Sequence, residues 1–272
     1  MPEPPRPYTE ASLRADLEQL GIATGDIVMV HAAMSRMGRL LHGPDTFIAA
    51  LRAAVGGAGT IMAYVDWDGD YEDLLDERGC ISPEWRDKVP PFDPQTSRAV
   101  RDNGILAEFI RTTQGALRSG SPGASVAAIG AKAAWLTADH PLDYGYGAGS
   151  PLAKLVESGG KVLMAGAPLD TMTLLHHAEH LADIAGKRIK RYDVPLLTGG
   201  KVWWRMTEEF DTSDPVVDGL PNDYFAEIVR TFLVSVAGTQ GQVGDAPCAL
   251  VDAERVCSFG RAWLEERFPR PA

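Results

Sequence analysis

Residues 45–65, DTFIAALRAAVGGAGTIMAYV, set the expected fold of this chain. The run TFIAALRAAV is expected to form a helix, with Asp45 as its cap and the following glycine pair as its end. The apolar segment TIMAYV, residues 60–65, follows as a buried strand, and IVMVH, residues 27–31, precedes the helix as another. A strand, a helix and a strand in this order predict an α/β protein.

The same alternation continues along the chain. Thr9 can cap a helix that stops at Gly21, and Asp170 can cap the helix that carries residues 173–180. The pattern predicts further helices at 104–113, from Ser150 with Pro151 at the first position, at 223–236 and at 252–268, and further strands at 125–130, 161–166, 192–197 and 201–207.

Domain organisation follows from what the pattern lacks. The chain shows no internal repeat, low-complexity block or Ser/Gly linker, so we expect one domain over residues 9–272 after a flexible, proline-rich tail over residues 1–8. A long irregular stretch runs from Asp66 to about Ser97. Stretches of this length inside a domain are often functional.

Composition excludes several classes of partner. The 272 residues carry a formal net charge of −11, which disfavours nucleic acid and anionic membrane surfaces as partners. Three cysteines without CxxC spacing support neither a disulfide framework nor a cysteine zinc site. The N-terminus lacks the apolar core of a signal peptide, and no stretch approaches the ~20 apolar residues of a membrane span. We therefore expect a cytoplasmic protein.

The segment TLLHHAEH, residues 173–180, holds half of the six histidines in the chain. On a helix, His176 and Glu179 are neighbours opposite the apolar stripe, so the carboxylate can orient one ring nitrogen and leave the other to take a proton. Two alternatives stay open at this point: the solvated face of an amphipathic helix, and a metal site formed by His176 and His180. The spacing does not match the HExxH zinc motif.

An acidic stretch lies inside the irregular region. Seven carboxylates stand between Asp66 and Glu77 without an intervening lysine or arginine. Tyr64, Trp67 and Tyr71 lie among or beside them and offer aromatic faces to sugar rings and ammonium groups. Such a stretch suits a polycationic ligand, although a solvated loop is the alternative.

Six segments in order resemble one known family. They are HAAMSRMGRLLHGPD (31–45), PPFDPQTS (90–97), RSGSPGAS (118–125), GAGSPLAKL (147–155), GAPLDTMTLLHHAEHLA (166–182) and FGRAWLEERF (259–268). Together they resemble the aminoglycoside 3-N-acetyltransferase family, in particular the subgroup that modifies gentamicin, kanamycin and neomycin. The resemblance implies a central mixed sheet flanked by helices, the antibiotic N-acetyltransferase fold rather than the GNAT fold. It also implies acetyl transfer from acetyl-coenzyme A to the 3-amino group of the 2-deoxystreptamine ring.

The resemblance also implies a catalytic set. The family motif Thr-x-x-His-x-x-Glu falls on Thr173, His176 and Glu179, whereas His177 and His180 fall at variable positions and are expected at the surface. A general base is useful because an aminoglycoside amine is mostly an ammonium ion at neutral pH. Glu179 would hold the imidazole, and Thr173 with a backbone N–H would stabilise the oxyanion. None of the cysteines lies in these motifs, so we expect direct transfer in a ternary complex.

The resemblance also implies residues that bind each of the two substrates. Those expected at acetyl-coenzyme A are His31, Ala32, Ala33, Ser35, Arg36, Gly38, Thr96, Ser97, Arg118, Ser119 and Ser125. Those expected at the aminoglycoside are Tyr64, Trp67, Asp68, Asp70, Tyr71, Glu209, Asp211, Asp214 and Asp223. The chain departs from the family pattern at Ala33, where serine is usual, and at Ser121, where histidine is usual.

Three rival functions remain at this stage. A metal-dependent hydrolase would use His176 and His180 and would bind zinc. A sequestering protein would bind polycations through the acidic stretch without chemistry. An acetyltransferase of another amine would keep the catalytic set but change the acceptor. The sequence does not determine the oligomeric state or the range of drugs.

Overall fold

The computed structural model describes residues 6–67, 69–211, 215–235 and 238–270. In this part of the chain, seven strands form a mixed sheet in the order β3-β4-β2-β1-β5-β9-β8, and β6 and β7 form a separate hairpin. Strand β1 pairs in parallel with both β2 and β5, whereas the other pairs in the sheet are antiparallel. The predicted α/β class with a mixed sheet is confirmed.

The elements have the following bounds. The strands are β1 Ile27–Ala32, β2 Thr60–Tyr64, β3 Leu117–Arg118, β4 Val126–Gly130, β5 Lys161–Ala165, β6 Ile189–Thr198, β7 Lys201–Phe210, β8 Thr239–Val243 and β9 Ala246–Asp252. The helices are α1 Glu10–Leu20, α2 Pro44–Val55, α3 Ile105–Thr112, α4 Ala133–Thr137, α5 Pro151–Glu157, α6 Leu174–Leu181, α7 Tyr224–Ser235 and α8 Ala253–Arg267. Short 3-10 turns are η1 Met34–Arg36, η2 Glu72–Leu74, η3 Arg101–Asn103 and η4 Leu169–Thr171.

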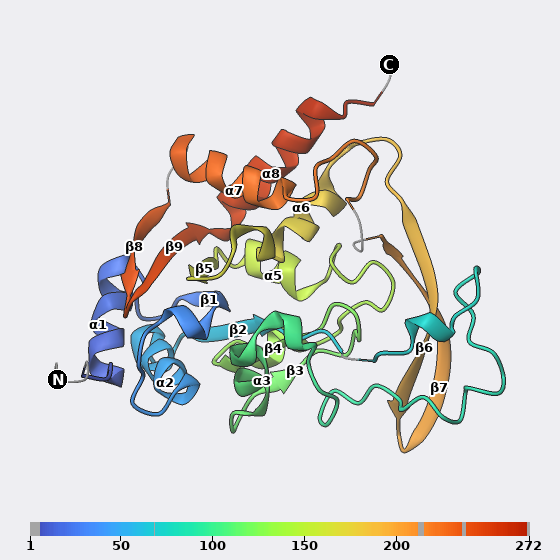
Figure 1. Ribbon diagram of the computed structural model, residues 1–272, viewed down its shortest axis with the longest axis horizontal. Helices are drawn as coiled ribbons and strands as arrows, with labels where there is room; N and C mark the ends of the chain where they lie inside the picture. Colours follow the sequence, from blue (N-terminus) through green and yellow to red (C-terminus); the bar gives the residue numbers. More distant parts are fainter. Residues whose placement is uncertain (1–5, 68, 212–214, 236–237, 271–272) are drawn as a thin grey trace, which may run out of the picture.

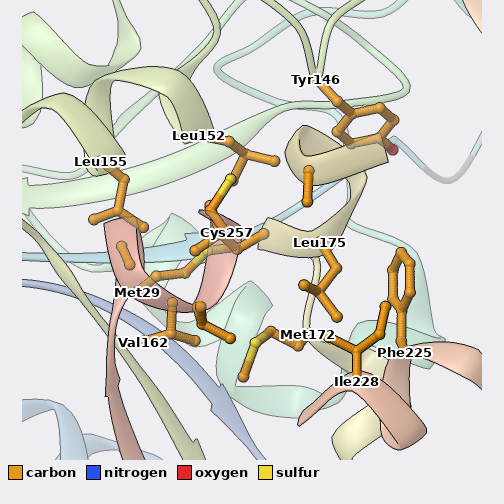
Figure 2. Packing of buried hydrophobic residues seen from close by; sticks show 14 of the residues in the cluster. Met29, Tyr146, Leu152, Leu155, Val162, Met172, Leu175, Phe225, Ile228 and Cys257 are labelled. Atoms are coloured by element: carbon orange, nitrogen blue, oxygen red, sulfur yellow. The ribbon is translucent and has the colours of Figure 1, made fainter. Parts of the chain in front are cut away.

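The sheet has a buried core on each face. Val28 and Val30 of β1 pack with α1, α2 and α3, whereas Ile27 and Met29 of the same strand pack with α4 to α8. This alternation follows from the two-residue period of a strand, which sends successive side chains to opposite faces. Helices therefore cover both faces, as Figure 1 shows for α1 to α3 on one side and α5 to α8 on the other. Figure 2 shows part of the second core, with Met172 among its members.

The β6–β7 hairpin extends from one end of the molecule, with the irregular stretch after β2 running beside it (Figure 1). Phe92 joins the two segments, because its N–H donates to Pro195 of β6 at 2.7 Å and its carbonyl accepts from Leu197 at 2.9 Å. Tyr71 adds a further link, since its hydroxyl donates to the carbonyl of Asp193 at 2.8 Å. The predicted irregular stretch is thus fixed against the hairpin rather than free in solvent.

Helix starts were predicted with mixed success. Thr9 accepts from the N–H of Ser12 at 3.2 Å, and Ser150 accepts from Ala153 at 3.1 Å, as expected for caps. The prediction for Asp45 is wrong, because Pro44 begins α2 after Gly43. A proline has no N–H to satisfy at the first helical position, so the helix can start at Pro44, two residues earlier than predicted.

Two further sequence predictions need correction. Asp170 does not cap α6, because it lies in η4 and α6 starts only at Leu174. The hairpin of β8 and β9 was missed altogether, since the exposed residues of β8 give no apolar alternation.

The N-terminal boundary lies earlier than predicted. Tyr8, assigned to the flexible tail, donates its N–H to Arg39 at 2.8 Å and its hydroxyl to Asp245 at 2.6 Å. Residues 1–5 of that predicted tail lie outside the described residues. None of the helices in the described ranges combines the length and apolar character needed to span a bilayer.

Candidate active site

Helix α6 carries a histidine paired with a buried carboxylate. Nδ1 of His176 lies 2.7 Å from Oε2 of Glu179, and because a carboxylate can only accept, Nδ1 donates. The Glu179 side chain is only 2% exposed, whereas that of His176 is 21% exposed. The other carboxylate oxygen, Oε1, accepts from the hydroxyl of Tyr224 on α7. The pairing that the helical spacing predicted is therefore present.

Aromatic rings hold the imidazole of His176 from two sides. Its centroid lies 4.8 Å from that of Tyr146 and 4.8 Å from that of Phe225. The Tyr146 hydroxyl lies 2.6 Å from that of Tyr64, and both hydroxyls lie 2.8 Å from the carbonyl of Gly123. The ring is thus restrained by packing as well as by its carboxylate, which leaves Nε2 for a substrate.

His176 lines a cavity of about 340 Å³ at the carboxyl end of β1. The predicted site residues that also line it are Tyr64, Thr173, His31, Ala32 and Ala33. We call it the His176 cavity. The structure therefore brings His176 and Thr173 together with the first part of the predicted cofactor loop.

His31 has an unusual environment in this cavity. Its Nε2 is shielded from water and has no hydrogen-bond partner among the described residues. Burial lowers the pKa of His31 to about 4, so the ring is neutral at pH 7. A shielded polar atom without a partner carries a desolvation cost, which a polar ligand in the cavity would relieve.

A second cavity, of about 200 Å³, is also lined by Tyr64. Trp67 and Glu209, both predicted to bind substrate, line it together with Asp66 and Glu72. We call it the Glu209 cavity. Its carboxylates suit a cationic ligand.

Asp66 is a weak acid in this cavity. Burial raises its pKa to about 6, opposed by a hydrogen bond from Asn103 and by the charge of Arg118. A third hollow, of about 310 Å³, adjoins Asp66 and is lined by two further predicted substrate residues, Asp70 and Tyr71. The acidic stretch thus faces two neighbouring cavities.

The remaining predicted substrate residues lie elsewhere. Nε of Arg188 lies 3.9 Å from Asp211, and Arg230 lies 3.2 Å from the exposed Asp223. Neither carboxylate lines the cavities described above. Asp68 and Asp214 lie outside the described residues.

The predicted phosphate loop is only partly suited to its role. Ser35 and Arg36 are exposed directly after Ala33, and the Arg36 guanidinium donates to the carbonyl of Gly166 at 2.9 Å. Gly38 has a φ of +79°, and a Cβ there would lie 2.2 Å from a carboxylate oxygen of Asp245. Glycine is therefore required at position 38 because the backbone packs against Asp245. A carboxylate at this place is a poor neighbour for a phosphate.

Five predicted cofactor residues are used by the fold itself. The Arg118 side chain donates to the carbonyls of Ser97 and Val65 and to the hydroxyl of Ser125. Ser119 is fully buried and lies 2.8 Å from Nδ1 of His140. The structure brings none of these residues to the His176 cavity.

Thr96 is the last of the five. Its hydroxyl donates to Asp93 at 2.8 Å, and the hydroxyl of Ser97 accepts from the N–H of Asp93 at 2.9 Å. These bonds close a turn, and we do not assign either residue to the cofactor.

The expected surface positions of His177 and His180 are wrong. His177 is buried, and its Nδ1 donates to the carbonyl of Tyr146 at 2.7 Å. Nε2 of His180 lies 2.8 Å from Oε1 of Glu209, although the angle is not that of a hydrogen bond. The sequence pattern of α6 is amphipathic, but these polar side chains are buried because they meet partners from distant segments. A solvated face is therefore the wrong interpretation of α6.

His176 and His180 each face a different carboxylate, an arrangement that does not favour a shared metal. Within the described ranges, no group of three or more His, Cys, Asp or Glu side chains is placed to hold a metal ion. The two unusual residues of the chain also lie at the site, because Ala33 lines the His176 cavity and Ser121 lines the Glu209 cavity.

Sequence reasoning missed several residues of the site. Tyr146, Tyr224 and Phe225 contact the His176–Glu179 pair, and Asn103 lines the His176 cavity and donates to Asp66. Tyr146 lies in a glycine-rich loop, GYGAG, before α5, and this glycine content was the only available signal. Tyr224 and Phe225 read as ordinary apolar positions of a helix.

Comparisons with known proteins agree with this geometry. The family model described as aminoglycoside 3-N-acetyltransferase matches residues 29–265. The aminoglycoside N(3)-acetyltransferase III of Pseudomonas aeruginosa is 45% identical over 96% of this chain and 95% of its own length. That of type VIII from Streptomyces fradiae is 44% identical over 96% and 93%.

Solved structures show the same likeness. AAC-IIIb, in a binary complex with CoASH, has a TM-score of 0.97 and 66% identity, covering 98% of this chain and 100% of its own. AAC-VIa with bound sisomicin has a TM-score of 0.91 and 39% identity, covering 97% and 100%. The predicted family fold is therefore confirmed. Family model, relatives and solved structures agree, and the chain belongs to the aminoglycoside 3-N-acetyltransferase family.

Proposed function

We propose that this protein acetylates the 3-amino group of the 2-deoxystreptamine ring of aminoglycosides with acetyl-coenzyme A and thereby confers antibiotic resistance. The observation that carries the proposal is the His176–Glu179 pair at the wall of a cavity. A histidine with one nitrogen fixed on a buried carboxylate and the other nitrogen free is suited to general base catalysis.

The residues of the His176 cavity fit an acyl-coenzyme A. The unpartnered Nε2 of His31 and the backbone of Ala32 and Ala33 offer polar contacts to an amide-containing arm. Ser35 and Arg36, exposed directly after these residues, can contact a pyrophosphate. The structure of AAC-IIIb with CoASH, at 66% identity, supports this assignment. Acetyl-coenzyme A, when bound, supplies an activated thioester carbonyl.

The catalytic side chains have separate tasks. His176 removes a proton from the ammonium group of the acceptor, since the amine has no free lone pair until it loses that proton. Glu179 keeps the proton on Nδ1 and stabilises the imidazolium that forms. Thr173 lines the same cavity, where its hydroxyl can donate to a carbonyl oxygen that becomes negative. We propose direct transfer without an acyl-enzyme: the amine nitrogen bonds to the thioester carbonyl carbon, the C–S bond breaks, and the coenzyme A thiolate leaves and takes up the proton that His176 removed.

The Glu209 cavity fits the acceptor. A polycationic aminoglycoside needs carboxylates, and Asp66, Glu72 and Glu209 supply them in this cavity. AAC-VIa with bound sisomicin, at 39% identity over 97% of this chain, supports an aminoglycoside as the acceptor. Tyr64 lines both cavities, so the acids lie beside the cavity that contains the proposed base.

A thiol-release assay tests the proposal. The protein is incubated with acetyl-coenzyme A and a panel of aminoglycosides, and free coenzyme A is measured with and without a chelator. We expect release that depends on the drug and is insensitive to the chelator. His176→Ala should lower turnover by at least ~10²-fold while calorimetry shows drug binding largely kept.

The exposed His42 provides the matched control, because His42→Ala removes an imidazole far from both cavities. Its turnover should equal that of the parent. Binding of drug without release of coenzyme A would instead indicate a sequestering protein, and loss of activity with chelator would indicate a hydrolase. An unchanged rate in His176→Ala would remove this residue from the mechanism.

A further inference from the structure

The carboxylate of Glu179 has two oxygens with two different partners. Oε2 holds Nδ1 of His176, and Oε1 accepts from the hydroxyl of Tyr224. Tyr224 lies 45 positions away in the sequence, in the first turn of α7. Both side chains are buried, with Glu179 2% and Tyr224 7% exposed. His176, Glu179 and Tyr224 therefore form one hydrogen-bonded series, of which only His176 lines the cavity.

The first turn of α7 contacts both members of the pair. Tyr224 donates to the carboxylate, and the adjacent Phe225 packs its ring 4.8 Å from that of His176. The two aromatic residues also pack on each other, with centroids 4.6 Å apart. Phe225 belongs to the same buried core as Met172 and Ile228 (Figure 2), so this turn is anchored to the fold.

A buried carboxylate needs such a partner for two physical reasons. Removing a charge from water is costly unless hydrogen bonds replace the lost solvation, and a single imidazole N–H satisfies only one oxygen. A carboxylate held at one oxygen can also rotate about its terminal bond, which is a broad torsion. A donor on the second oxygen fixes the plane in which the first oxygen faces His176.

We propose that Tyr224 is a positioning residue for acetyl transfer: its hydroxyl holds the Glu179 carboxylate in the orientation that keeps His176 ready to accept a proton. This inference rests on the function proposed above. Tyr224 does not line the His176 cavity, so it acts through Glu179 and not on the substrates.

Tyr224→Phe tests this role, because it removes one oxygen and keeps the ring packing. We expect kcat for thiol release to fall by about 10-fold to 100-fold, the effect of losing a hydrogen bond to a charged group. The KM values for drug and acetyl-coenzyme A should stay within about 2-fold, since no substrate contact is lost. Tyr8→Phe is the matched control. It removes a tyrosine hydroxyl from the carboxylate of Asp245, and because Tyr8 lines neither the His176 cavity nor the Glu209 cavity, kcat should stay unchanged.

A double-mutant cycle separates positioning from general loss of stability. If Tyr224 acts through Glu179, then adding Tyr224→Phe to Glu179→Gln should lower kcat by less than about 2-fold, because the orientation that it fixes no longer matters. Fully multiplicative effects in the cycle would overturn the proposal, as would an unchanged kcat in Tyr224→Phe.

A spectroscopic measurement tests the proposal without any activity. In the parent, proton NMR should show a strongly downfield Nδ1–H resonance of His176 with slow solvent exchange. In Tyr224→Phe this resonance should move upfield and exchange faster, whereas in Tyr8→Phe it should not change. If Tyr224→Phe fails to fold, 3-fluorotyrosine placed at position 224 keeps the ring and the hydroxyl and changes only its acidity. The resonance must then still shift, and no shift would overturn the inference even if the parent acetylates aminoglycosides.

Discussion

Two histidines of helix α6, four residues apart, each lie against a glutamate, and the two pairs differ in geometry and surroundings. His176 and Glu179 are joined by a hydrogen bond of 2.7 Å within one helix, and the carboxylate has a second donor. His180 and Glu209 meet across the gap to β7 at 2.8 Å, without the angle of a hydrogen bond. Oε1 of Glu209 also accepts from the N–H of Phe210 at 2.7 Å.

The surroundings of the two imidazoles differ as well. The first ring lines the cavity that contains the unpartnered His31, whereas the second lies among the rings of Tyr144, Tyr146 and Phe210. From this comparison we expect a histidine next to a carboxylate to act as a base only when the carboxylate is fixed and the second nitrogen faces a substrate cavity. In the second pair, the carboxylate itself faces the cavity.

Among changes to the carboxylates, the largest expected effect comes from Glu179→Gln. The glutamine amide can donate to Nδ1 and so favour the tautomer in which Nε2 carries the proton and cannot accept another. We expect kcat to fall by about 10²-fold with little change in drug KM, measured by thiol release at saturating acetyl-coenzyme A. An unchanged kcat would show that the Glu179 carboxylate does not determine the tautomer of His176.

Glu209→Gln makes the same chemical change in the other pair, so each variant is the control for the other. Here we expect drug KM to rise by about 10-fold, because a charged contact to an ammonium group is lost, and kcat to stay within about 2-fold. The KM for acetyl-coenzyme A should not change. If instead kcat falls and KM holds, the two pairs have been assigned the wrong way round.

The sequence could predict only the first of these pairs. His176 and Glu179 are three positions apart on one helix, and this local relation can be read from the spacing. The contacts of Glu179 with Tyr224 and of His180 with Glu209 join residues on separate elements, so they depend on how α7 and the β6–β7 hairpin pack. The same limit explains why His177 and His180 were expected at the surface.

For the fold, the sequence predicted what local pattern determines. The apolar strands β1, β2, β4 and β5 were found because they are buried on both faces, whereas β8 was missed because most of its side chains are exposed. Residues such as Ser119 and Arg118 show a further limit. A motif of small polar residues and an arginine can bind a ligand, or it can form hydrogen bonds with buried backbone groups. Here Arg118 donates to the carbonyl of Ser97, and Ser119 accepts from the N–H of Val126.

Changing Asp66 should have the smallest effect on stability and drug binding. Unlike Glu179 and Glu209, this cavity carboxylate does not lie against a histidine. Burial raises its pKa to about 6, above the unfolded value near 3.8. The folded protein therefore binds this proton more tightly than the unfolded chain does. The resulting stabilisation is complete below about pH 4 and is lost as the pH rises through 6. At pH 7 the buried charge lowers stability, so Asp66→Asn should raise Tm at pH 7 by roughly 2–4 °C and leave Tm nearly unchanged at pH 4.

The same residue should make drug binding depend on pH. Between pH 7 and pH 5 the parent loses the Asp66 charge, so its drug KM should rise by a few fold, as one carboxylate of the Glu209 cavity becomes neutral. Asp66→Asn should show the higher KM at both pH values, with a flatter profile. Scanning calorimetry at pH 4 and pH 7 and drug titrations at pH 5 and pH 7 measure the two effects. A parent KM that is constant over this range would mean that Asp66 makes no contact with the drug and that Glu209 and Glu72 carry the attraction.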